Sequence, residues 1–596
     1  MTTRTPACPS SHWLWSPKQP HGRFLHLTDI HPDTHYTPYT RPSSACHNTH
    51  FGKKSTRVAG FWGTPVSDCD SPIRLVDLAL DFAEQWADEV DWVVWTGDSA
   101  RHDNDPQLAR TEEEIEGSNQ YLATRMKEVF WDRGVPVIPS IGNNDVWPHN
   151  VMYPGPSSTT RAYAKMWTPI LSPLTNLSTL SHGLYFSTPL LTEHKVAAVS
   201  LNTLFFYDSN KAVDGCEDDD DPGTEQMVWL EAELERFRRD GWRVYLTGHV
   251  PPSTRNYYAG CYRRYGELAL RFQDIILGHF YGHMNMDHYF WISLDDVKSA
   301  SSKKSKSKPG ARQSAKFPIT IQGAHDYDHE DLMRELKALP REEKVDFADY
   351  AVVNVPASVV PTYFPGMRVY TYNVSGIYPP PPIVPEESFD VNTEFDDDTE
   401  SESQGKKSKE PNPCKGQKKN SPTCVGGKPR HSHPLSATRA PGPFTPTGYA
   451  QYFLPGVEEA GESEAPVWEL EYATYESGGN GTWAEKGLLP MRMIPRELGG
   501  HMRCPSLEAP ESLADPEPDA EDPSEPEASK KKHKKKKAER RKEKQRERLR
   551  TRQLLPYQLR DLTIPSYLAL GRRLAREEGV WGEFKRNMYV GTGEEE

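Results

Sequence analysis

Residues 23–31, RFLHLTDIH, decide how the chain is expected to fold. Phe24, Leu25 and Leu27 give this run the character of a buried strand, and Asp29 and His31 follow directly at its end. In open α/β sheets, functional sites lie beyond the carboxyl ends of the strands. The stretch therefore predicts a strand that carries two metal-binding residue types at its functional end.

The same arrangement recurs along the first 290 residues. Further apolar runs end in polar clusters: DWVVWTGDSARHD (91–103), VPVIPSIGNND (135–145), KVAAVSLN (195–202), RVYLTGH (243–249) and QDIILGHFYGH (273–283). Helical patterns lie between several of these runs. One is expected to start at Ser71-Pro72, and another to be capped by Thr224 and to stop at Gly241. The alternation predicts an α/β layered fold.

Low-complexity stretches divide the chain. The expected parts are an N-terminal segment (1–20), a catalytic domain (21–297), a Ser/Lys-rich linker (298–316), a further folded part (317–378), a low-complexity insert (379–445), a C-terminal folded segment (446–504), an acidic and then basic tract (505–552) and a C-terminal segment (553–596). FPITIQ (317–322), DYAVVNV (349–355) and MRVYTYNV (367–374) are expected to be strands, and residues 330–339 a helix.

Composition excludes several classes of protein. The formal net charge is −14, so no general basic field argues for a nucleic-acid partner. The sequence contains no run of about 18 apolar residues, so it predicts no membrane span. The eight cysteines include no close C-x-x-C pair, which argues against a zinc knuckle.

Six polar residues at the strand ends suggest a metal centre. They are carboxylate, carboxamide and imidazole donors: Asp29, His31, Asp98, Asn143, His249 and His283. Two divalent metals about 3.5–4 Å apart need a bridging carboxylate and several further donors of these kinds. Each residue alone is more simply explained as a turn or a helix cap. Six of them in this order make coincidence improbable.

The order of these motifs along the chain resembles that of the calcineurin-like metallophosphoesterase superfamily. The motifs are TDIH, TGDSARHD, IGNND, TGHVPP and YGHMNMDH. GDSARHD is similar to its acid-sphingomyelinase-like branch, and SIGNNDVWPHN, GHFYGHMNMDHYF and residues 348–373 resemble fungal endopolyphosphatases. The resemblance implies a layered β-sandwich flanked by helices, with a C-terminal extension and disordered inserts.

The resemblance also implies roles for the residues at the strand ends. Asp29 and His31 would hold the first metal, Asp98 would bridge both, and the second metal would be held by Asn143, His249 and His283. The ions would be two divalent metals among Mn, Mg, Co, Zn and Fe, because mixed oxygen and nitrogen donors discriminate poorly between them.

Two positions depart from the family pattern. The family's final GH-x-H places a histidine where this chain has Asn285, so the last ligand of the first metal could be Asn285, His288 or water; Asn285 matches by register.

Many members also have a histidine, thought to act as a general acid, where this chain has Asn144. An amide donates hydrogen bonds but cannot protonate a leaving group, which suits cleavage of a phosphoanhydride better than that of an alkyl ester. Asn144, His102 and His149 are the expected substrate contacts, and His102 and Asn144 the catalytic ones.

The function implied by the resemblance is hydrolysis of internal phosphoanhydride bonds of inorganic polyphosphate. Two alternatives stay open at this point: a sphingomyelinase-like phosphodiesterase, and a catalytically weak polyanion-binding protein. No motif reports an oligomeric state.

The resemblance implies a vacuolar location. The first residues lack the apolar stretch of a signal peptide, so attachment to a membrane would require an anchor missing from this sequence. Three N-x-Ser/Thr sequons, at Asn176, Asn373 and Asn480, agree with a glycoprotein. In such a compartment, hypotheses for disulfides are Cys46 with Cys69 and Cys216 with Cys261, since each pair lies within one loop-rich stretch.

Two lysine-rich tracts remain, at 300–316 and 530–552. The second is open to three interpretations: a solvated charged linker or helix, a nuclear-localisation-like signal, or a tail that docks a polyanion.

Overall fold

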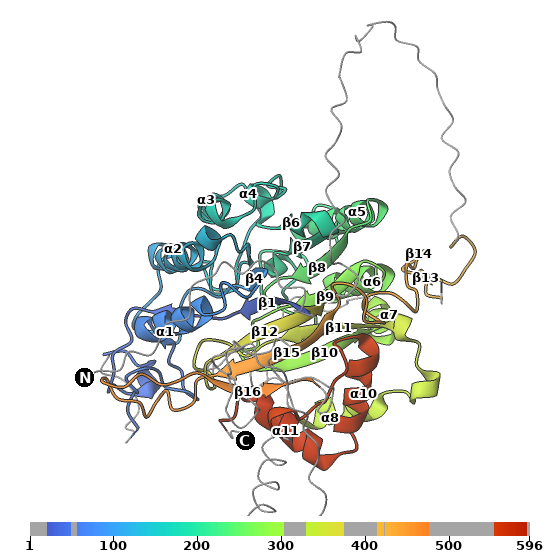
Figure 1. Ribbon diagram of the computed structural model, residues 1–596. Coiled ribbons are helices and arrows are strands. Elements are labelled where there is room, and N and C mark those ends of the chain that lie inside the picture. The colour runs from blue at the N-terminus through green and yellow to red at the C-terminus, as the bar shows by residue number, and fades with distance from the viewer. Residues whose placement is uncertain are drawn as a thin grey trace, which may run out of the picture.

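A computed structural model describes residues 21–48, 57–302, 329–374, 414–421, 423–475 and 553–592 (Figure 1). The predictions for residues 1–20, for a strand at 317–322 and for the basic tract 530–552 lie outside the described residues, as does most of the linker. The helix α7 (Leu294–Ser302) runs into the first residues of that linker.

Two mixed sheets of six strands form the centre of the molecule. The first has the order β16-β15-β12-β1-β4-β5. Its strands are β1 (His21–Leu27), β4 (Trp92–Trp95), β5 (Val137–Pro139), β12 (Gly366–Asn373), β15 (Pro446–Phe453) and β16 (Glu469–Ala473). β1, β4 and β5 are parallel, whereas β12, β15 and β16 add antiparallel neighbours.

The second sheet has the order β10-β11-β9-β8-β7-β6. Its strands are β6 (Phe186–Leu191), β7 (Val196–Ser200), β8 (Arg243–Thr247), β9 (Ile276–Phe280), β10 (His288–Ser293) and β11 (Tyr350–Val355). β7, β8, β9 and β11 are parallel, and the two edge strands are antiparallel to their neighbours. The six apolar runs of the sequence are all strands, as predicted, and β6 and β10 are additional ones.

The sheets pack face to face through aromatic side chains. The ring of Phe24 in β1 lies 5.6 Å from Tyr245 in β8 and 5.1 Å from Phe280 in β9, and Trp92 in β4 lies 5.4 Å from Tyr245. These rings are buried. The predicted layered β-sandwich is confirmed.

Helices cover the outer faces of the sandwich (Figure 1). They are α1 (Ile73–Glu84), α2 (Glu112–Val129), α3 (Ser158–Trp167), α4 (Leu180–Gly183), α5 (Pro222–Arg239), α6 (Ala259–Arg271), α7, α8 (His329–Ala338), α10 (Ile564–Leu574) and α11 (Glu578–Met588). Phe82 of α1 packs 5.4 Å from Tyr452 of the first sheet. The helices α5, α6 and α10 contact strands of the second sheet.

Three local predictions differ from the structure. The helix expected to start at Ser71-Pro72 is α1, which begins at Ile73 after Pro72 and has no side-chain cap. The helix α5 begins at Pro222, because the Asp221 side chain accepts from the backbone N–H groups of Gly223 and Thr224; Asp221, not Thr224, is the cap. Residues 414–421 and 423–445 were expected within the low-complexity insert, yet they are ordered in short strands and turns. A disulfide and contacts with α6 hold this part.

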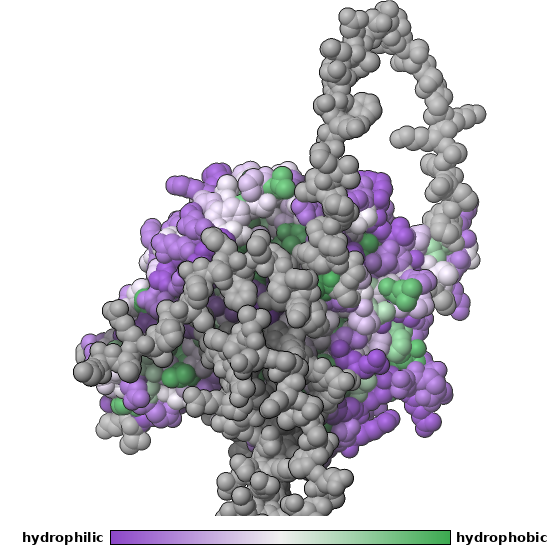
Figure 2. Space-filling view, in the orientation of Figure 1, coloured by the Kyte–Doolittle hydropathy of each residue, from purple (hydrophilic) through white to green (hydrophobic). Residues whose placement is uncertain are grey.

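Three disulfides join described cysteines. Cys46–Cys69 and Cys216–Cys261 confirm the two hypotheses, and Cys414–Cys424 is a third pair that the sequence did not indicate. Across the described ranges, no helix is both long and apolar enough to cross a bilayer. Hydrophilic residues cover most of the described surface that is visible in Figure 2, with small separate hydrophobic patches.

Candidate metal centre

The predicted ligand residues all lie on loops that follow parallel strands. Asp29 and His31 follow β1, Asp98 follows β4, Asn143 follows β5, and the two histidines follow β8 (His249) and β9 (His283). The carboxyl ends of parallel strands meet at one edge, and the two packed sheets bring their edges together. Positive φ angles occur at Asp29, His31, Asp98, His283 and Asn285, between 43° and 73°. This conformation is uncommon for residues other than glycine and clusters at functional sites.

The side chains form two groups that share Asp98. His31 Nε2 lies 3.9 Å from Asp29 Oδ1 and 3.5 Å from Asp98 Oδ2. On the other side of the same carboxylate, His249 Nε2 lies 3.3 Å from Asp98 Oδ2. The donor atoms of Asp29, His31 and Asp98 lie within 4.8 Å of one another, as do those of Asp98, His249 and His283. Asp98 is therefore common to both groups, which is the position that a bridging ligand would take.

Asn143 completes the second group. Its Oδ1 lies 2.8 Å from His249 Nε2 and 2.8 Å from His283 Nδ1, so the three donor atoms converge. The amide is oriented from behind, because Asn143 Nδ2 donates to Asn150 Oδ1 at 2.9 Å. His249 is oriented in the same way by its Nδ1, which donates to the Thr96 carbonyl at 2.7 Å.

The electrostatics favour a cation at both groups. Burial lowers the pKa of His31, but Asp29, Asp98 and Asp70 outweigh it and raise that pKa to about 9. The pKa of His249 is likewise raised to about 9, because Asp98 outweighs burial. Burial and the charge of His249 lower the pKa of His283 to about 3. The carboxylates thus stabilise positive charge in a buried place, which a divalent ion can supply.

The donors fit metal ions in a further respect. His31 Nε2 and Asn285 Oδ1 are buried and have no hydrogen-bond partner among the described residues. His31 Nδ1 donates to the carbonyl of Ala100 at 2.8 Å, which leaves the Nε2 lone pair directed at the carboxylates. Buried polar atoms normally have a partner, so unpartnered acceptors within a set of oxygen and nitrogen donors fit bound cations.

A hydrogen-bond relay supports Asp29. The Thr28 hydroxyl donates to Asp29 Oδ2, the Thr96 hydroxyl donates to Thr28 Oγ1 at 2.6 Å, and His26 Nε2 lies 3.0 Å from Thr96 Oγ1. Thr96 also accepts from His249 through its carbonyl. One threonine therefore orients a donor in each group, and sequence patterns gave no sign of it.

Asn144 lies beside the bridging carboxylate. Its backbone N–H donates to Asp98 Oδ1 at 2.8 Å and its Nδ2 donates to Asp98 Oδ2 at 2.7 Å. The side chain is buried. The amide that the sequence predicts as a substrate contact is thus directed at Asp98 in this arrangement. Asp145 connects the loop after β5 to the loop after β4, because its carboxylate accepts from the backbone N–H groups of Asp98 and Ser99.

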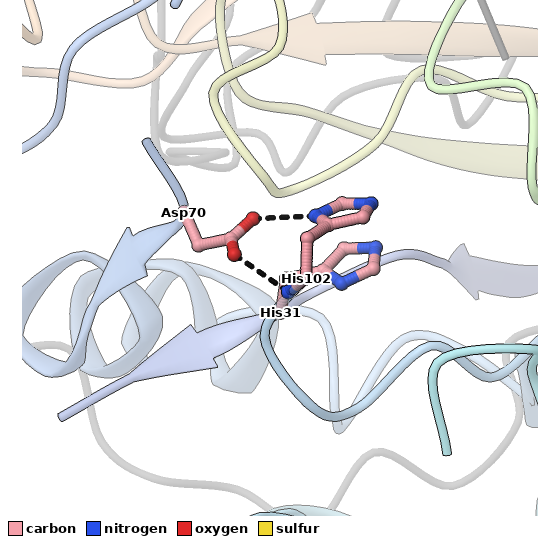
Figure 3. Close-up of side chains that lie close together, drawn as sticks. All are labelled: His31, Asp70 and His102. Atoms are coloured by element: carbon pink, nitrogen blue, oxygen red, sulfur yellow. Dashed lines mark hydrogen bonds and ion pairs between the residues drawn. The ribbon is translucent and has the colours of Figure 1, made fainter. Parts of the chain in front are cut away.

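His102 stacks on His31 and pairs with Asp70 (Figure 3). The two ring centroids are 3.9 Å apart, and His102 Nδ1 and its backbone N each lie 2.7 Å from an Asp70 carboxylate oxygen. Sequence reasoning missed Asp70. The nearest signal was its neighbour Cys69, whose disulfide to Cys46 fixes the loop that presents it.

His149 lies at the second group. Its Nε2 lies 3.1 Å from Asn143 Nδ2, and its Nδ1 lies 3.3 Å from Asp103 Oδ1. The hydrogen bond and charge of His149 lower the pKa of Asp103 below its ordinary value. One imidazole therefore flanks each group, His102 at the first and His149 at the second, and each is paired with a carboxylate.

The alternatives for the last ligand are separated in space. His288 is on β10 and packs against Phe584 of α11, with ring centroids 6.0 Å apart. Burial lowers the pKa of His288 to about 3. Asn285 follows His283 on the same loop, whereas His288 is the first residue of β10.

Comparison with known proteins agrees with this geometry. The Calcineurin-like phosphoesterase family matches residues 22–285. An endopolyphosphatase of Cryptococcus neoformans is 35% identical over 96% of this chain and 91% of its own length. The endopolyphosphatase of Schizosaccharomyces pombe is 37% identical over 60% of this chain and 62% of its own, and that of Saccharomyces cerevisiae 32% identical over 60% and 62%.

The first of these similarities extends over nearly the whole of both chains. Calcineurin-like phosphoesterases use two divalent metal ions, which agrees with the two donor groups that share Asp98. The chain therefore belongs to the fungal endopolyphosphatase family, within the calcineurin-like phosphoesterases.

Proposed function

We propose that this protein is a hydrolase that uses two divalent metals to cleave internal phosphoanhydride bonds of inorganic polyphosphate. The observation that carries the proposal is the pair of buried donor groups sharing Asp98, in a chain 35% identical to an endopolyphosphatase over 96% of its length. The first metal is assigned to Asp29, His31, Asp98 and Asn285, and the second to Asp98, Asn143, His249 and His283.

The chain's own residues have separate roles in this reaction. Two bound ions would lower the pKa of water and neutralise charge on the phosphoryl group. Asp98 would be a ligand of both ions and Asn143 of the second, and Asn144 fixes the Asp98 carboxylate through two hydrogen bonds. His102 is held by Asp70 through Nδ1, which leaves its Nε2 to contact a phosphoryl oxygen.

The leaving group explains why a phosphoanhydride is the favoured substrate. Asn144 cannot act as a general acid, and loss of such an acid costs about 10²–10⁴-fold when the leaving oxygen is basic. A departing phosphate chain is a weak base and needs no strong proton donor. An alkyl phosphodiester such as sphingomyelin does need one, so the sphingomyelinase-like alternative is less favoured.

The compartment we propose is the vacuole. The three disulfides support an oxidising environment, where such bonds persist.

Gel analysis of long-chain polyphosphate after brief digestion with each divalent metal tests the proposal. We expect products of intermediate length and little sphingomyelin cleavage. Orthophosphate as the sole product, or a preference for sphingomyelin, would contradict it. The variant Asn144→His sharpens the test, because it should improve cleavage of alkyl substrates relative to polyphosphate by about 10-fold.

A further inference from the structure

The segment Cys414–Arg430, called here the basic hairpin, has the sequence CKGQKKNSPTCVGGKPR. It contains four lysines and one arginine and no acidic residue. Its strands β13 (Cys424–Val425) and β14 (Lys428–Pro429) pair antiparallel, and the disulfide Cys414–Cys424 closes it. The structure describes the whole hairpin apart from residue 422.

The basic hairpin is anchored on α6 (Figure 1). Arg271 Nε donates to the carbonyl of Pro429 at 3.4 Å. Gly426 packs so closely that a Cβ built there would lie 2.7 Å from the Glu267 carboxylate. The disulfide and these contacts hold the hairpin in one position, so its charges are displayed without a further ordering cost.

The cations of the hairpin divide into two sets. At its base, Lys428 Nζ lies 2.5 Å from Glu231, and Arg430 Nη2 lies 2.8 Å from Asp349. The remaining three are exposed and make no ion pair with any residue in the described part of the chain: Lys415, Lys418 and Lys419. Glu267, the acidic group beneath Lys419, already has Arg263 at 3.9 Å. The base cations attach the hairpin to the fold, and the other three face solvent.

We infer that Lys415, Lys418 and Lys419 form a second binding site for polyphosphate, separate from the site of cleavage. The inference rests on the proposed function, because the hairpin would bind a stretch of the polyphosphate substrate that is distant from the bond being cleaved. Exposed ammonium groups bind phosphates without strict geometry, and a polyanion gains affinity by releasing condensed counterions. A rigid hairpin with three unpaired lysines suits this chemistry.

The position of α6 relates this site to the metal centre. The ring centroid of Tyr207 lies 5.2 Å from that of His283, and Tyr207 forms an isolated β-bridge with Tyr257, two residues before the start of α6. Glu267 is eight residues beyond the first residue of α6, or about 12 Å along the helix axis. A long polyphosphate chain can occupy both places, whereas a very short one cannot. The hairpin should therefore favour long chains.

The test replaces all three lysines with glutamine in the full chain. For long-chain polyphosphate, we expect KM to rise about tenfold with kcat unchanged, because uniform binding is lost. The slope of log KM against log salt should decrease in magnitude by about 2, since three charge contacts disappear. KM for tripolyphosphate should not change. The matched control is the triple variant Lys165→Gln, Lys337→Gln, Lys344→Gln, which removes the same charge elsewhere and should behave as the wild type.

An unchanged KM for long chains would overturn the inference, as would an equal rise for tripolyphosphate or in the control. Binding is also measured directly, by titrating long-chain polyphosphate into each protein without divalent metal. The hairpin variant should bind about tenfold more weakly than the control, and equal affinities would overturn the inference. This arm separates the two proposals, because a wild-type chain that binds but does not cut polyphosphate contradicts the proposed function alone.

Discussion

Asp98 has the most demanding position of any single residue at the site. Its Oδ2 faces both His31 and His249, and both of its carboxylate oxygens accept from Asn144. The neighbouring His249 and His31 and the hydrogen bond from Asn144 outweigh burial and hold the pKa of Asp98 well below its ordinary value. The lowered pKa favours the ionised carboxylate, the form that a bridging ligand needs.

Asp98→Asn should lower polyphosphate turnover by at least about 100-fold, because losing even a supporting partner of a ligand costs 10–100-fold. Elemental analysis should find fewer than two metals per chain. Asp103→Asn, which alters a half-exposed carboxylate next to His149, is the control and should keep its metals. Near-normal turnover by Asp98→Asn would contradict the two-metal site.

A variant of Thr28 tests the hydrogen-bond relay that supports Asp29. Thr28→Val keeps the shape of the side chain and removes the hydroxyl that donates to Asp29 Oδ2. We expect metal affinity, measured by calorimetric titration, to fall by about 10–100-fold. Thr247→Val is a matched control, because the buried Thr247 hydroxyl has no partner among the described residues. Equal affinities in the two variants would show that the relay does not orient Asp29.

At the scale of the elements, close approach of loops decides the geometry. The loop after β5 packs closely against the loop after β4 at Gly142. A Cβ atom built on Gly142 would lie 2.1 Å from Asp98 Oδ1 and 2.3 Å from the backbone N of Asp98. The turn is possible only because glycine has no side chain, and it lets the backbone N–H and the side chain of Asn144 reach the Asp98 carboxylate.

Gly142→Ala should therefore displace Asp98 and lower turnover by about 100-fold or more, since an error of about 1 Å costs that much. Far-UV circular dichroism should stay near that of the wild type, because the change is confined to one turn. Gly117→Ala in α2 meets nothing within 4 Å and should raise stability by up to about 1 kcal/mol. If Gly142→Ala turned over polyphosphate normally, the loop contact would have no role in the geometry of Asp98.

At the scale of the whole molecule, late segments of the chain support an early site. Asp287, two residues after Asn285, pairs with Arg368 of β12 and accepts from the Tyr472 hydroxyl of β16. Its backbone N–H donates to the carbonyl of Met588 in α11 at 3.1 Å. The loop that carries His283 and Asn285 is thus held by three elements from the C-terminal half.

His47 makes a similar long-range connection and should give stability a pH dependence. It lies between Asp33 and Asp105, with Nε2 and Nδ1 each 2.9 Å from a carboxylate oxygen. Burial lowers the pKa of His47, but its hydrogen bonds to Asp33 and Asp105 outweigh burial and raise it above 6.5.

Because the folded-state pKa of His47 is raised, its contribution to stability is complete below about pH 6.5 and is lost as pH rises through the folded-state value. The Tm difference between the wild type and His47→Gln should therefore shrink as pH increases from 6 to 9. Calorimetry on both proteins measures it. A difference independent of pH would show that His47 is not protonated between the two carboxylates.

Local sequence patterns were sufficient to predict most strands of the sandwich and the polar residues at their ends. Each strand end lies only a few residues from its donor; for example, Leu27 ends β1 and Asp29 follows it. The apolar run predicts the strand, and the type of the residue that follows predicts the chemistry. The parallel arrangement then requires the strand ends to meet. Metal-binding residue types were readable for the same reason, because they follow the strands directly.

Long-range contacts in the folded chain bring the other residues to the site. Asp70 reaches His102 from a disulfide-linked loop, and Asp287 is held by Arg368, Tyr472 and Met588. The low-complexity composition around Cys414 hid an ordered hairpin, since its packing partner α6 lies about 150 residues earlier in the chain. Such contacts depend on which surfaces meet once the two sheets have packed, and no local pattern of apolar and polar residues records that.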